Sequence, residues 1–409
     1  MSYQRLYEIS DDLINLSSDL TFTRSEIFGA LEPSTQVATV LKGARGIGKS
    51  TVVLQFLADK KKKGHKAFYF SADSALLNQT LAELALEYSR RGGQYLAIDE
   101  IHYIENWQGQ VKTILDAFPS LKVIVSGSSS LSLATQGADL SRRHSVIHAR
   151  GLSFREYIDK NYGITLSIYK LDELLNNVES IVSDILRLFK ARGLDILDIF
   201  SDFLKTGYFL SKSNFDRDNQ YYASLIQTMN SIIDIDVPSA HQDVDSMGRN
   251  NIKKLLKHIA LKCPFTPNIS ELGRNLSISN DNVLKKYLLY LCESEILNNI
   301  YCSNKSHKDF QKPEKILLNN TNYCYAFETQ PLLGTIRETY AASVLSYLGE
   351  LTAPTHGDFC LNQKWIFEVG GPSKNKKQIR FQDHSYVLAD QFLSADKNKI
   401  PLWILGFFW

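Results

Sequence analysis

The segment Lys42–Val53, KGARGIGKSTVV, restricts the fold of this chain more than any other feature. Gly43 and Gly48-Lys49-Ser50 have the spacing G-x-x-x-x-G-K-[ST], which is that of a phosphate-binding loop. An apolar run, Val37–Leu41, precedes the loop and indicates a buried strand, and an amphipathic helical pattern follows it. A strand, a glycine loop and a helix in this order direct backbone N–H groups toward phosphate oxygens. The sequence therefore predicts a P-loop.

This context gives individual residues of the loop a role. Lys49 is predicted to contact the β- and γ-phosphates of a nucleotide, and the Ser50 hydroxyl is predicted to ligate Mg²⁺. The predicted cofactors are therefore ATP and Mg²⁺. The residues expected to surround the nucleotide are Gly43, Arg45, Gly46, Gly48, Lys49, Ser50 and Thr51.

Two further apolar strands end in polar side chains. Gln94–His102, QYLAIDEIH, ends in Asp99, predicted to hold Mg²⁺ through its water shell, and Glu100, predicted to be the base that orients the attacking water. Lys49, Asp99 and Glu100 are thus the predicted catalytic residues. In the strand Leu121–Ser130, Ser126 or Ser128 either contacts the γ-phosphate or its water, or caps a turn. The sequence leaves these two roles open.

The composition is that of a globular protein. The chain has 409 residues, 44% of them hydrophobic and 22% charged, which predicts two to four domains. Its net charge of +2 is too small to indicate nucleic acid by itself. Its five cysteines contain no C-x-x-C pair, which favours a reducing cytoplasm over a zinc site or a disulfide framework. Since a signal-peptide core and an apolar run of ~20 residues are both missing, a cytoplasmic location without a membrane partner is expected.

The hydrophobic pattern changes along the chain. Alternating strand-like and helix-like segments from about residue 35 to 149 predict a parallel sheet with helices on both faces. The pattern then becomes helical, and Val237–Gly248 is interpreted as a linker. In the last hundred residues we predict the helix Leu332–Leu348, followed by strands at Asp358–Leu361, Lys364–Val369, Ser385–Leu388 and Leu402–Gly406.

The residues between that linker and the last hundred follow the order of a winged helix. Helices are predicted at Ile269–Leu276 and Asp281–Ser294, with a strand-like segment after them. The second of these helices would enter a DNA major groove with Asn280, Asn282, Lys285 and Lys286. It also contains the apolar run Leu288–Leu291, so much of it must be packed. A protein contact is therefore slightly favoured over DNA binding.

Together these segments resemble a family of prokaryotic AAA-type (AAA+) P-loop ATPases whose C-terminal domain is related to the restriction-endonuclease, PD-(D/E)xK, fold. The resemblance is carried by GARGIGKST, LAIDEIHYIENW, VIVSGSSS, RGLSFREYI and FLKTGYF, and near the end by GTIRETYAASVL, GDF, FEVGG, KKQI and IPLWILGF. It implies an α/β fold, ATP and Mg²⁺ binding, and hydrolysis. It also implies a P-loop core in residues 1–151, a helical lid in 152–245, a winged helix in 246–305 and a restriction-endonuclease-like domain in 306–409.

The last domain departs from the pattern of an active nuclease of this fold. There, an acid on one strand is followed by Glu-x-Lys on the next, whereas Gly370 stands here at the expected lysine position. Lys364, on the same face of the strand, and Lys374 are the available replacements. We therefore expect a degenerate, non-catalytic nuclease site formed by Glu338, Asp358 and Glu368.

Three functions are consistent with these features. We favour an ATP-binding and Mg²⁺-dependent ATP-hydrolysing switch or remodelling protein whose C-terminal half binds an unidentified protein partner, with DNA binding through the winged helix left open. The first alternative is an ATP-dependent DNA-processing protein with an active nuclease, which Gly370 disfavours. The second is a non-hydrolysing interaction protein stabilised by ATP, which the Asp99-Glu100 pair disfavours. Arg142 and Arg143 either reach a γ-phosphate, in cis or from a neighbouring copy in a homo-oligomer, or form a surface pair.

Overall fold

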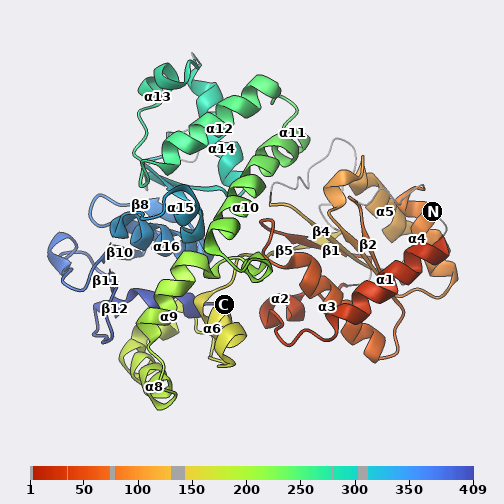
Figure 1. The fold of residues 1–409 in the computed structure, drawn as a ribbon, viewed down its shortest axis with the longest axis horizontal. Coiled ribbons are helices and arrows are strands. Elements are labelled where there is room, and N and C mark those ends of the chain that lie inside the picture. Colours follow the sequence, from red (N-terminus) through yellow and green to blue (C-terminus); the bar gives the residue numbers. More distant parts are fainter. Residues whose placement is uncertain (1–2, 35, 74–78, 130–142, 279, 303–311) are drawn as a thin grey trace. The chain divides into compact units, whose positions relative to one another are not determined.

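The computed structural model describes residues 3–34, 36–73, 79–129, 143–278, 280–302 and 312–409 (Figure 1). The chain folds into two compact units, Met1–Gly151 and Leu152–Trp409. Within the described ranges, no helix has the length and apolar character needed to span a bilayer.

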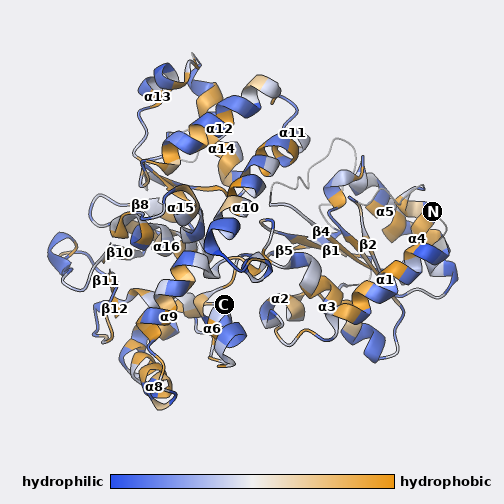
Figure 2. Cartoon of the chain, viewed as in Figure 1, coloured by the Kyte–Doolittle hydropathy of each residue, from blue (hydrophilic) through white to orange (hydrophobic). Residues whose placement is uncertain are grey.

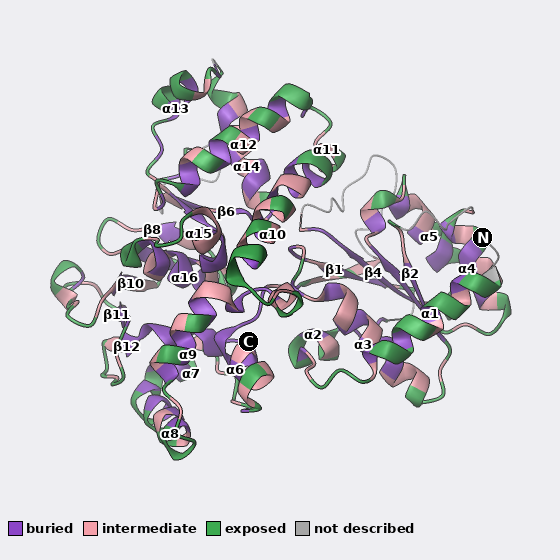
Figure 3. Cartoon of the chain, viewed as in Figure 1, coloured by how far each residue is buried: buried purple, intermediate pink, exposed green. Residues whose placement is uncertain are grey.

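The first unit is built on a parallel five-stranded sheet in the order β2–β3–β4–β1–β5. Its strands are β1 (Ala38–Lys42), β2 (Ala67–Ser71), β3 (Tyr95–Asp99), β4 (Lys122–Gly127) and β5 (His144–His148). Nearly all residues of β1 to β4 are buried, as expected for a parallel sheet that is covered on both faces (Figure 3). The predicted parallel sheet is therefore confirmed. The edge strand β5 is only half-buried.

Helices cover both faces of this sheet because alternate side chains of each strand point to opposite sides. On one face, Ile98 of β3 lies in a core cluster with Leu84 and Val111. On the other face, the ring of Tyr95 packs at 6.0 Å from that of Phe56. Leu84 belongs to α4 and Val111 to α5, whereas Phe56 belongs to α3. The helices of this unit are α1 (Tyr3–Ser17), α2 (Ser25–Ala30), α3 (Lys49–Lys62), α4 (Leu81–Arg90) and α5 (Trp107–Ala117).

The second unit begins with helices, as predicted. They are α6 (Phe154–Tyr162), α7 (Leu171–Asn176), α8 (Val178–Ala191), α9 (Ile196–Asp202), α10 (Asp218–Ser231) and α11 (Val237–Ala240), with π-helical turns at Phe203–Gly207 and Ile232–Asp236. The linker predicted at Val237–Gly248 is wrong in part, because α11 occupies its start and the next helix begins at Ser246. Val237 is buried, and Pro238 lies in the first turn of α11, where a helix tolerates proline.

Three helices and an antiparallel pair of strands follow; the helices and the first strand agree with the predicted order, whereas the second strand was not predicted. They are α12 (Ser246–Ala260), α13 (Ile269–Leu276), α14 (Asp281–Glu293), β6 (Leu297–Cys302) and β7 (Lys315–Leu318). Leu284 and Leu288 of α14 are buried, the Asn280 side chain accepts a hydrogen bond from the Asn282 N–H at 2.9 Å, and Lys286 pairs with Asp243. Some of the proposed DNA-reading residues therefore already have intramolecular partners, and the winged-helix assignment stays a prediction.

The last part of the chain adds strands to the same sheet as this pair. The seven-stranded mixed sheet has the order β12–β11–β10–β9–β8–β6–β7, and β6 pairs in parallel with β8 at Tyr301 and Thr352. One sheet therefore runs across the boundary predicted between residues 305 and 306, which itself lies outside the described residues. The elements are α15 (Thr321–Phe327), α16 (Leu333–Leu348), β8 (Leu351–Ala353), β9 (Phe359–Leu361), β10 (Trp365–Gly370), β11 (Ser385–Ala389) and β12 (Lys399–Pro401). An α/β domain is compatible with this sheet, and its restriction-endonuclease-like identity stays a prediction.

The strand predicted at Leu402–Gly406 is wrong. Leu402–Phe407 is a 3₁₀ helix, and all of its residues are buried. A short apolar run that is buried on every side has no periodicity by which a strand and a helix can be distinguished. Figure 2 shows that the buried strands of the first unit are also mostly hydrophobic.

Candidate functional site

The predicted phosphate-binding loop connects β1 to the first turn of α3, and glycine is required at two of its positions. A Cβ atom at Gly43 would collide with the carbonyl oxygen of Ala149. Gly48, the N-cap of α3, has a φ of 89°, in the left-handed region that favours glycine. These glycines let the chain turn sharply between β1 and α3. The N-terminus of α3 therefore faces the concave side of the loop. A helix N-terminus in this position favours an anion.

Lys49 and Ser50 are the first residues of α3. The Lys49 ammonium group donates hydrogen bonds of 2.8 Å to the carbonyl oxygens of Gly43 and Ala44. The side chain is thus folded over the loop, and its buried cation lies beside the backbone that would contact phosphates. Neutral carbonyl oxygens are weaker partners for an ammonium group than phosphate oxygens are, so an incoming phosphate can replace them.

Asp99, at the end of β3, is held by several hydrogen-bond donors. Its side chain is 3% exposed. One carboxylate oxygen accepts from the Tyr69 hydroxyl at 2.6 Å, and the other accepts from the Ser126 hydroxyl and from the Glu100 N–H at 3.0 Å. A buried carboxylate with this many donors is fixed in position. The structure thus brings Asp99 and Ser126 together, whereas the predicted contact of Ser126 with a γ-phosphate stays a prediction.

Tyr69 is a residue of this site that sequence reasoning missed. Burial raises the pKa of its hydroxyl, the charge of Asp99 raises it further, and a hydrogen bond with Ser50 acts in the opposite direction. The hydroxyl is therefore protonated and donates to Asp99. Tyr69 pairs with Ala97 across the two strands, which places its ring on the same face as Asp99. The register of β2 against β3 decides whether Tyr69 reaches Asp99, and this register cannot be read from the sequence of β2.

Replacing Tyr69 with phenylalanine is expected to lower the free energy of unfolding by about 1.5–3 kcal/mol, the usual loss for a hydrogen bond to a charged group. The ring remains, so packing is retained and Asp99 loses one of its donors. Urea denaturation of the two proteins measures the difference. Tyr103→Phe, at an exposed tyrosine of the same unit, is the matched control. An unchanged midpoint in Tyr69→Phe would show that the bond to Asp99 contributes nothing to stability.

Arg24 is a second residue that the sequence did not reveal. Its buried guanidinium group donates to the carbonyl oxygen of Ile47 in the loop at 3.3 Å, and to those of Gly151 at 3.0 Å and Arg150. It therefore ties the loop to the backbone that follows β5. Because its partners are backbone carbonyls more than twenty and more than a hundred residues away, no local motif points to it.

Glu100 follows Asp99 in a left-handed backbone conformation, with φ of 50° and ψ of 43°. This region is unfavourable for a residue with a side chain, and such strain is concentrated at functional sites. The Oε2 atom of the Glu100 carboxylate lies 3.4 Å from Nδ1 of His102. A carboxylate that is held but not fully buried suits the role of a base.

The remaining predicted residues are less closely engaged with this site. A terminal nitrogen of Arg45 lies 3.5 Å from the Tyr103 hydroxyl, Thr51 is half-buried in α3, and Ser128 is buried just beyond β4. Gly46 is an exposed residue of the loop. Arg143 forms an ion pair with Asp116 in which both side chains are substantially exposed, as in the surface-pair alternative. Its role toward a neighbouring copy stays a prediction, and Arg142 lies outside the described residues.

The residues at this site fit Mg²⁺. Magnesium prefers hard oxygen ligands and keeps several of its waters. The Ser50 hydroxyl and the buried Asp99 carboxylate are both such ligands, and the Tyr69 hydroxyl donates to Asp99. Asp99 is held in place before any metal arrives, which reduces the cost of organising the site.

Comparison with known proteins supports the assignment of the first unit. Residues 35–158 match a family model described as an AAA domain. The P-loop geometry and the five-stranded parallel sheet agree with this match. No curated protein sequence matches the chain.

Solved structures with some likeness to the chain include two DnaA proteins. One is a replication initiator DnaA bound to AMPPCP and single-stranded DNA, with 12% identity over 66% of this chain and 87% of that chain and a TM-score of 0.29. Another is AMPPCP-bound DnaA from Aquifex aeolicus, with 16% identity over 66% of this chain and 86% of that chain and a TM-score of 0.27. Protein NMB1076 from Neisseria meningitidis has 20% identity over 32% of this chain and 85% of that chain, with a TM-score of 0.21. TM-scores this low carry no argument about fold or function.

In the second predicted site, in the C-terminal unit, lysine ammonium groups pair with the predicted acidic side chains. Nζ of Lys315 lies 2.7 Å from the carboxylate of Glu338 and 3.8 Å from that of Asp358. Asp358 also accepts a hydrogen bond of 2.7 Å from the Val369 N–H. The cation of Lys315 thus lies beside two of the three predicted acids.

Lys374 compensates for the glycine at position 370. A Cβ atom at Gly370 would lie 2.7 Å from Cγ of Lys374, so the lysine side chain fills the space above this glycine. Its ammonium group pairs with Glu368, which is only 1% exposed. Burial raises the pKa of Glu368, and Lys374 opposes that shift. The alternative replacement, Lys364, pairs instead with Asp172 at 3.7 Å and stacks on Trp365.

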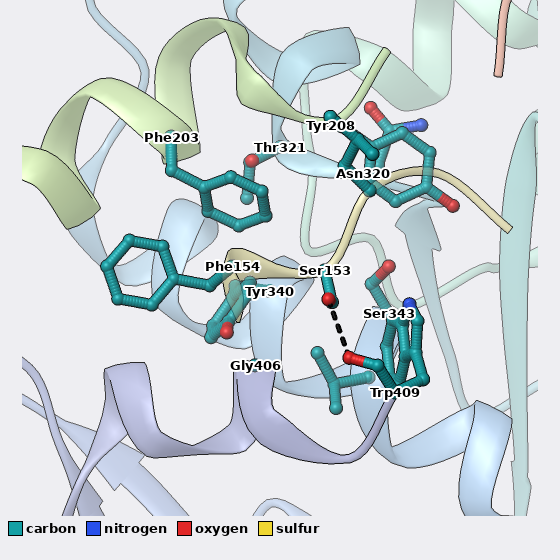
Figure 4. A pocket seen from close by; sticks show the side chains of 12 residues that line it. Ser153, Phe154, Phe203, Tyr208, Asn320, Thr321, Tyr340, Ser343, Gly406 and Trp409 are labelled. Carbon is teal, nitrogen blue, oxygen red and sulfur yellow. Dashed lines mark hydrogen bonds between the residues drawn. The ribbon is translucent and has the colours of Figure 1, made fainter. Parts of the chain in front are cut away.

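A small cavity in the second unit is too narrow for a nucleotide. Figure 4 shows it among buried side chains from α6, α16 and the last residues, with the Ser153 hydroxyl donating to the Trp409 carbonyl oxygen at 2.8 Å. About 10 Å³ is open to the centre of a water molecule, roughly the space for one water. The Tyr340 hydroxyl faces the cavity and has no hydrogen-bond partner among the described residues. A buried water is the occupant that this size and polarity allow.

Proposed function

We propose that this chain is an ATP-binding and Mg²⁺-dependent ATP-hydrolysing switch or remodelling protein whose C-terminal half binds a partner. The observation that carries the proposal is the buried carboxylate of Asp99, which the Tyr69 and Ser126 hydroxyls and the Glu100 N–H hold at the end of β3, in the same unit as the P-loop. A loop that binds phosphate only through its backbone has no need of a buried acid held in this way. A loop that also uses a divalent cation does.

Each residue then has a defined task. The loop N–H groups and the N-terminus of α3 bind the phosphates, and Lys49 exchanges its carbonyl partners for the β- and γ-phosphate oxygens. Glu100 orients a water molecule for attack and accepts its proton. Ser50 and Asp99 would hold Mg²⁺, which neutralises charge on the phosphates when bound. Arg24 keeps the loop in place.

The direct test is ATP turnover by the purified chain with Mg²⁺, compared with the same assay in EDTA. Phosphate release that requires Mg²⁺ supports the proposal. Tight ATP binding without release, under any condition including added DNA, would support the non-hydrolysing interaction protein instead. No ATP binding at all would contradict both of these functions.

The C-terminal site is expected not to cleave DNA. Lys315 already supplies the positive charge beside Glu338 and Asp358, so a divalent cation has to displace an ion pair before it can bind there. The observation that favours the nuclease alternative is Lys374, which brings a lysine to Glu368 from outside the expected position. The preparation used for ATP turnover should be incubated with linear, circular and single-stranded DNA in Mg²⁺ and in Mn²⁺.

Intact substrates under all these conditions are the expected result. Cleavage that disappears in Glu368→Ala but survives Lys49→Ala would contradict it, and would show that the nuclease works independently of ATP. Lys49→Ala is a suitable control because it alters only the first unit.

A further inference from the structure

A basic surface loop connects the parallel strands β10 and β11 in the second unit. Residues 371–384 contain four cationic side chains and one carboxylate, which are Lys374, Lys376, Lys377, Arg380 and Asp383. Lys374 forms an ion pair with Glu368 of the same unit. Lys377 and Arg380 are exposed and form no ion pair within the part of the chain that the structure describes. Their charge is therefore available to a partner.

The same loop displays an aromatic ring. Phe381 is 82% exposed, more than any other large hydrophobic side chain among the described residues. The guanidinium carbon of Arg380 lies 4.3 Å from the centre of the ring, within the range of a cation–π contact. The Phe381 ring therefore contributes little to the core and is accessible to a partner.

The loop that carries Phe381 is anchored on both sides of the ring. Ile379, two residues before it, is completely buried. The Ser385 hydroxyl donates to the carbonyl oxygens of Gln382 at 2.7 Å and Ile379 at 3.2 Å, and the Lys399 ammonium group donates to that of Pro372 at 2.6 Å. A ring presented by a braced loop loses little conformational freedom when it binds a partner.

A hollow adjoins these residues at the carboxyl end of β10. Its volume is about 400 Å³, and it is lined by Gly371, Ser373, Lys374, Asn375, Lys377 and Gln378. The strands β10 and β11 are parallel, and the crevice outside the carboxyl ends of parallel strands is where open α/β sheets bind ligands. The hollow is polar and open, which suits a charged chain that passes over the surface better than an enclosed small molecule.

We propose that Lys377, Arg380 and Phe381, named here the Phe381 surface, bind a single-stranded nucleic acid. The cations would contact successive phosphates, and an unpaired base would stack on the Phe381 ring. Cations beside an exposed aromatic ring are the combination by which proteins hold single strands without reading their sequence. A double helix keeps its bases stacked on one another, so it would gain only the phosphate contacts. The residues of the Phe381 surface belong neither to the P-loop nor to the predicted winged helix.

The test is the fluorescence anisotropy of a labelled oligothymidylate titrated with the full chain in the absence of ATP. Phe381→Ala should weaken binding about 5- to 150-fold, the usual range for one stacked base. Phe381→Trp should retain binding because tryptophan also stacks, whereas Phe381→Leu should behave like the alanine variant. Leu332→Ala, which removes another strongly exposed apolar side chain of the same unit, should have no effect.

Salt dependence separates the cations from the ring. Lys377→Ala should make the slope of log K against log salt shallower by about 0.7, the amount for one phosphate contact with a single strand. Phe381→Ala should leave the slope unchanged. Lys190→Ala, at an exposed lysine at the end of α8, should alter neither affinity nor slope.

Equal affinity of Phe381→Ala and the unmodified chain for oligothymidylate would overturn the proposal, as would tighter binding to duplex DNA of the same length. Binding to phosphatidylserine vesicles or to polyglutamate, without binding to the oligonucleotide, would overturn it in favour of a membrane or an acidic protein. Lys49→Ala should bind the oligonucleotide normally, so a failure of the ATPase proposal would leave this result unaffected.

Discussion

Lys49→Ala should lower the affinity for ATP by about 100-fold or more, which corresponds to about 2.7 kcal/mol of binding free energy. The lysine is the cation nearest the predicted phosphate position, and it also bonds the carbonyl oxygens of Gly43 and Ala44. Its loss therefore removes the charge that faces the phosphates and two contacts that shape the loop. Charge-assisted hydrogen bonds of this kind contribute roughly 1.5–3 kcal/mol each.

Titration with a fluorescent ATP analogue measures this change, and Lys63→Ala is the matched control. Lys63 lies at the other end of α3, where it pairs with Asp59 on the surface. Its replacement removes a lysine from the same helix without touching the loop, so ATP affinity should remain within about twofold. Binding of ATP by Lys49→Ala at the unmodified affinity would show that this loop does not hold phosphates.

Glu100→Gln should retain ATP binding and lose turnover by about 10²–10⁴-fold, the range for a general base. Glutamine has the shape of glutamate, so the left-handed turn after Asp99 and the hydrogen bond from the residue 100 N–H to Asp99 remain. The amide, however, is a very poor proton acceptor at neutral pH. In Glu100→Gln, ATP affinity should therefore be retained while the turnover rate falls, whereas in Lys49→Ala both should fall.

Phosphate release under saturating ATP measures the effect, with Glu105→Gln as the control. Glu105 is an exposed carboxylate in the segment that follows the same turn. If Glu105→Gln lost turnover and Glu100→Gln kept it, the assignment of the base would be wrong. A comparable loss of ATP affinity in Glu100→Gln would indicate instead that Glu100 shapes the nucleotide site.

The sequence by itself determined the parts of this protein that depend on local geometry. The P-loop was predictable because Gly43 and Gly48 are required by the backbone between a strand and a helix. The boundaries of α13 were predictable too, since Asn268 caps its first turn and Ser277 ends it in a left-handed conformation. The apolar runs of β1 to β4 also indicated buried strands, because the whole of each pattern lies within a few consecutive residues.

Only the tertiary structure decided which distant residues join each site. Tyr69 reaches Asp99 because β2 lies beside β3 in one particular register, and Arg24 reaches Ile47 and Gly151 because the loop and the end of β5 lie beside each other. Lys374 takes over the position above Gly370 because the chain turns back over the end of β10. The half-buried β5 has no pattern of its own, and its pairing with β1 makes it a strand. Residue preferences and periodicity act over a few residues, whereas these contacts depend on strand order, register and chain reversal, which the complete packed fold sets.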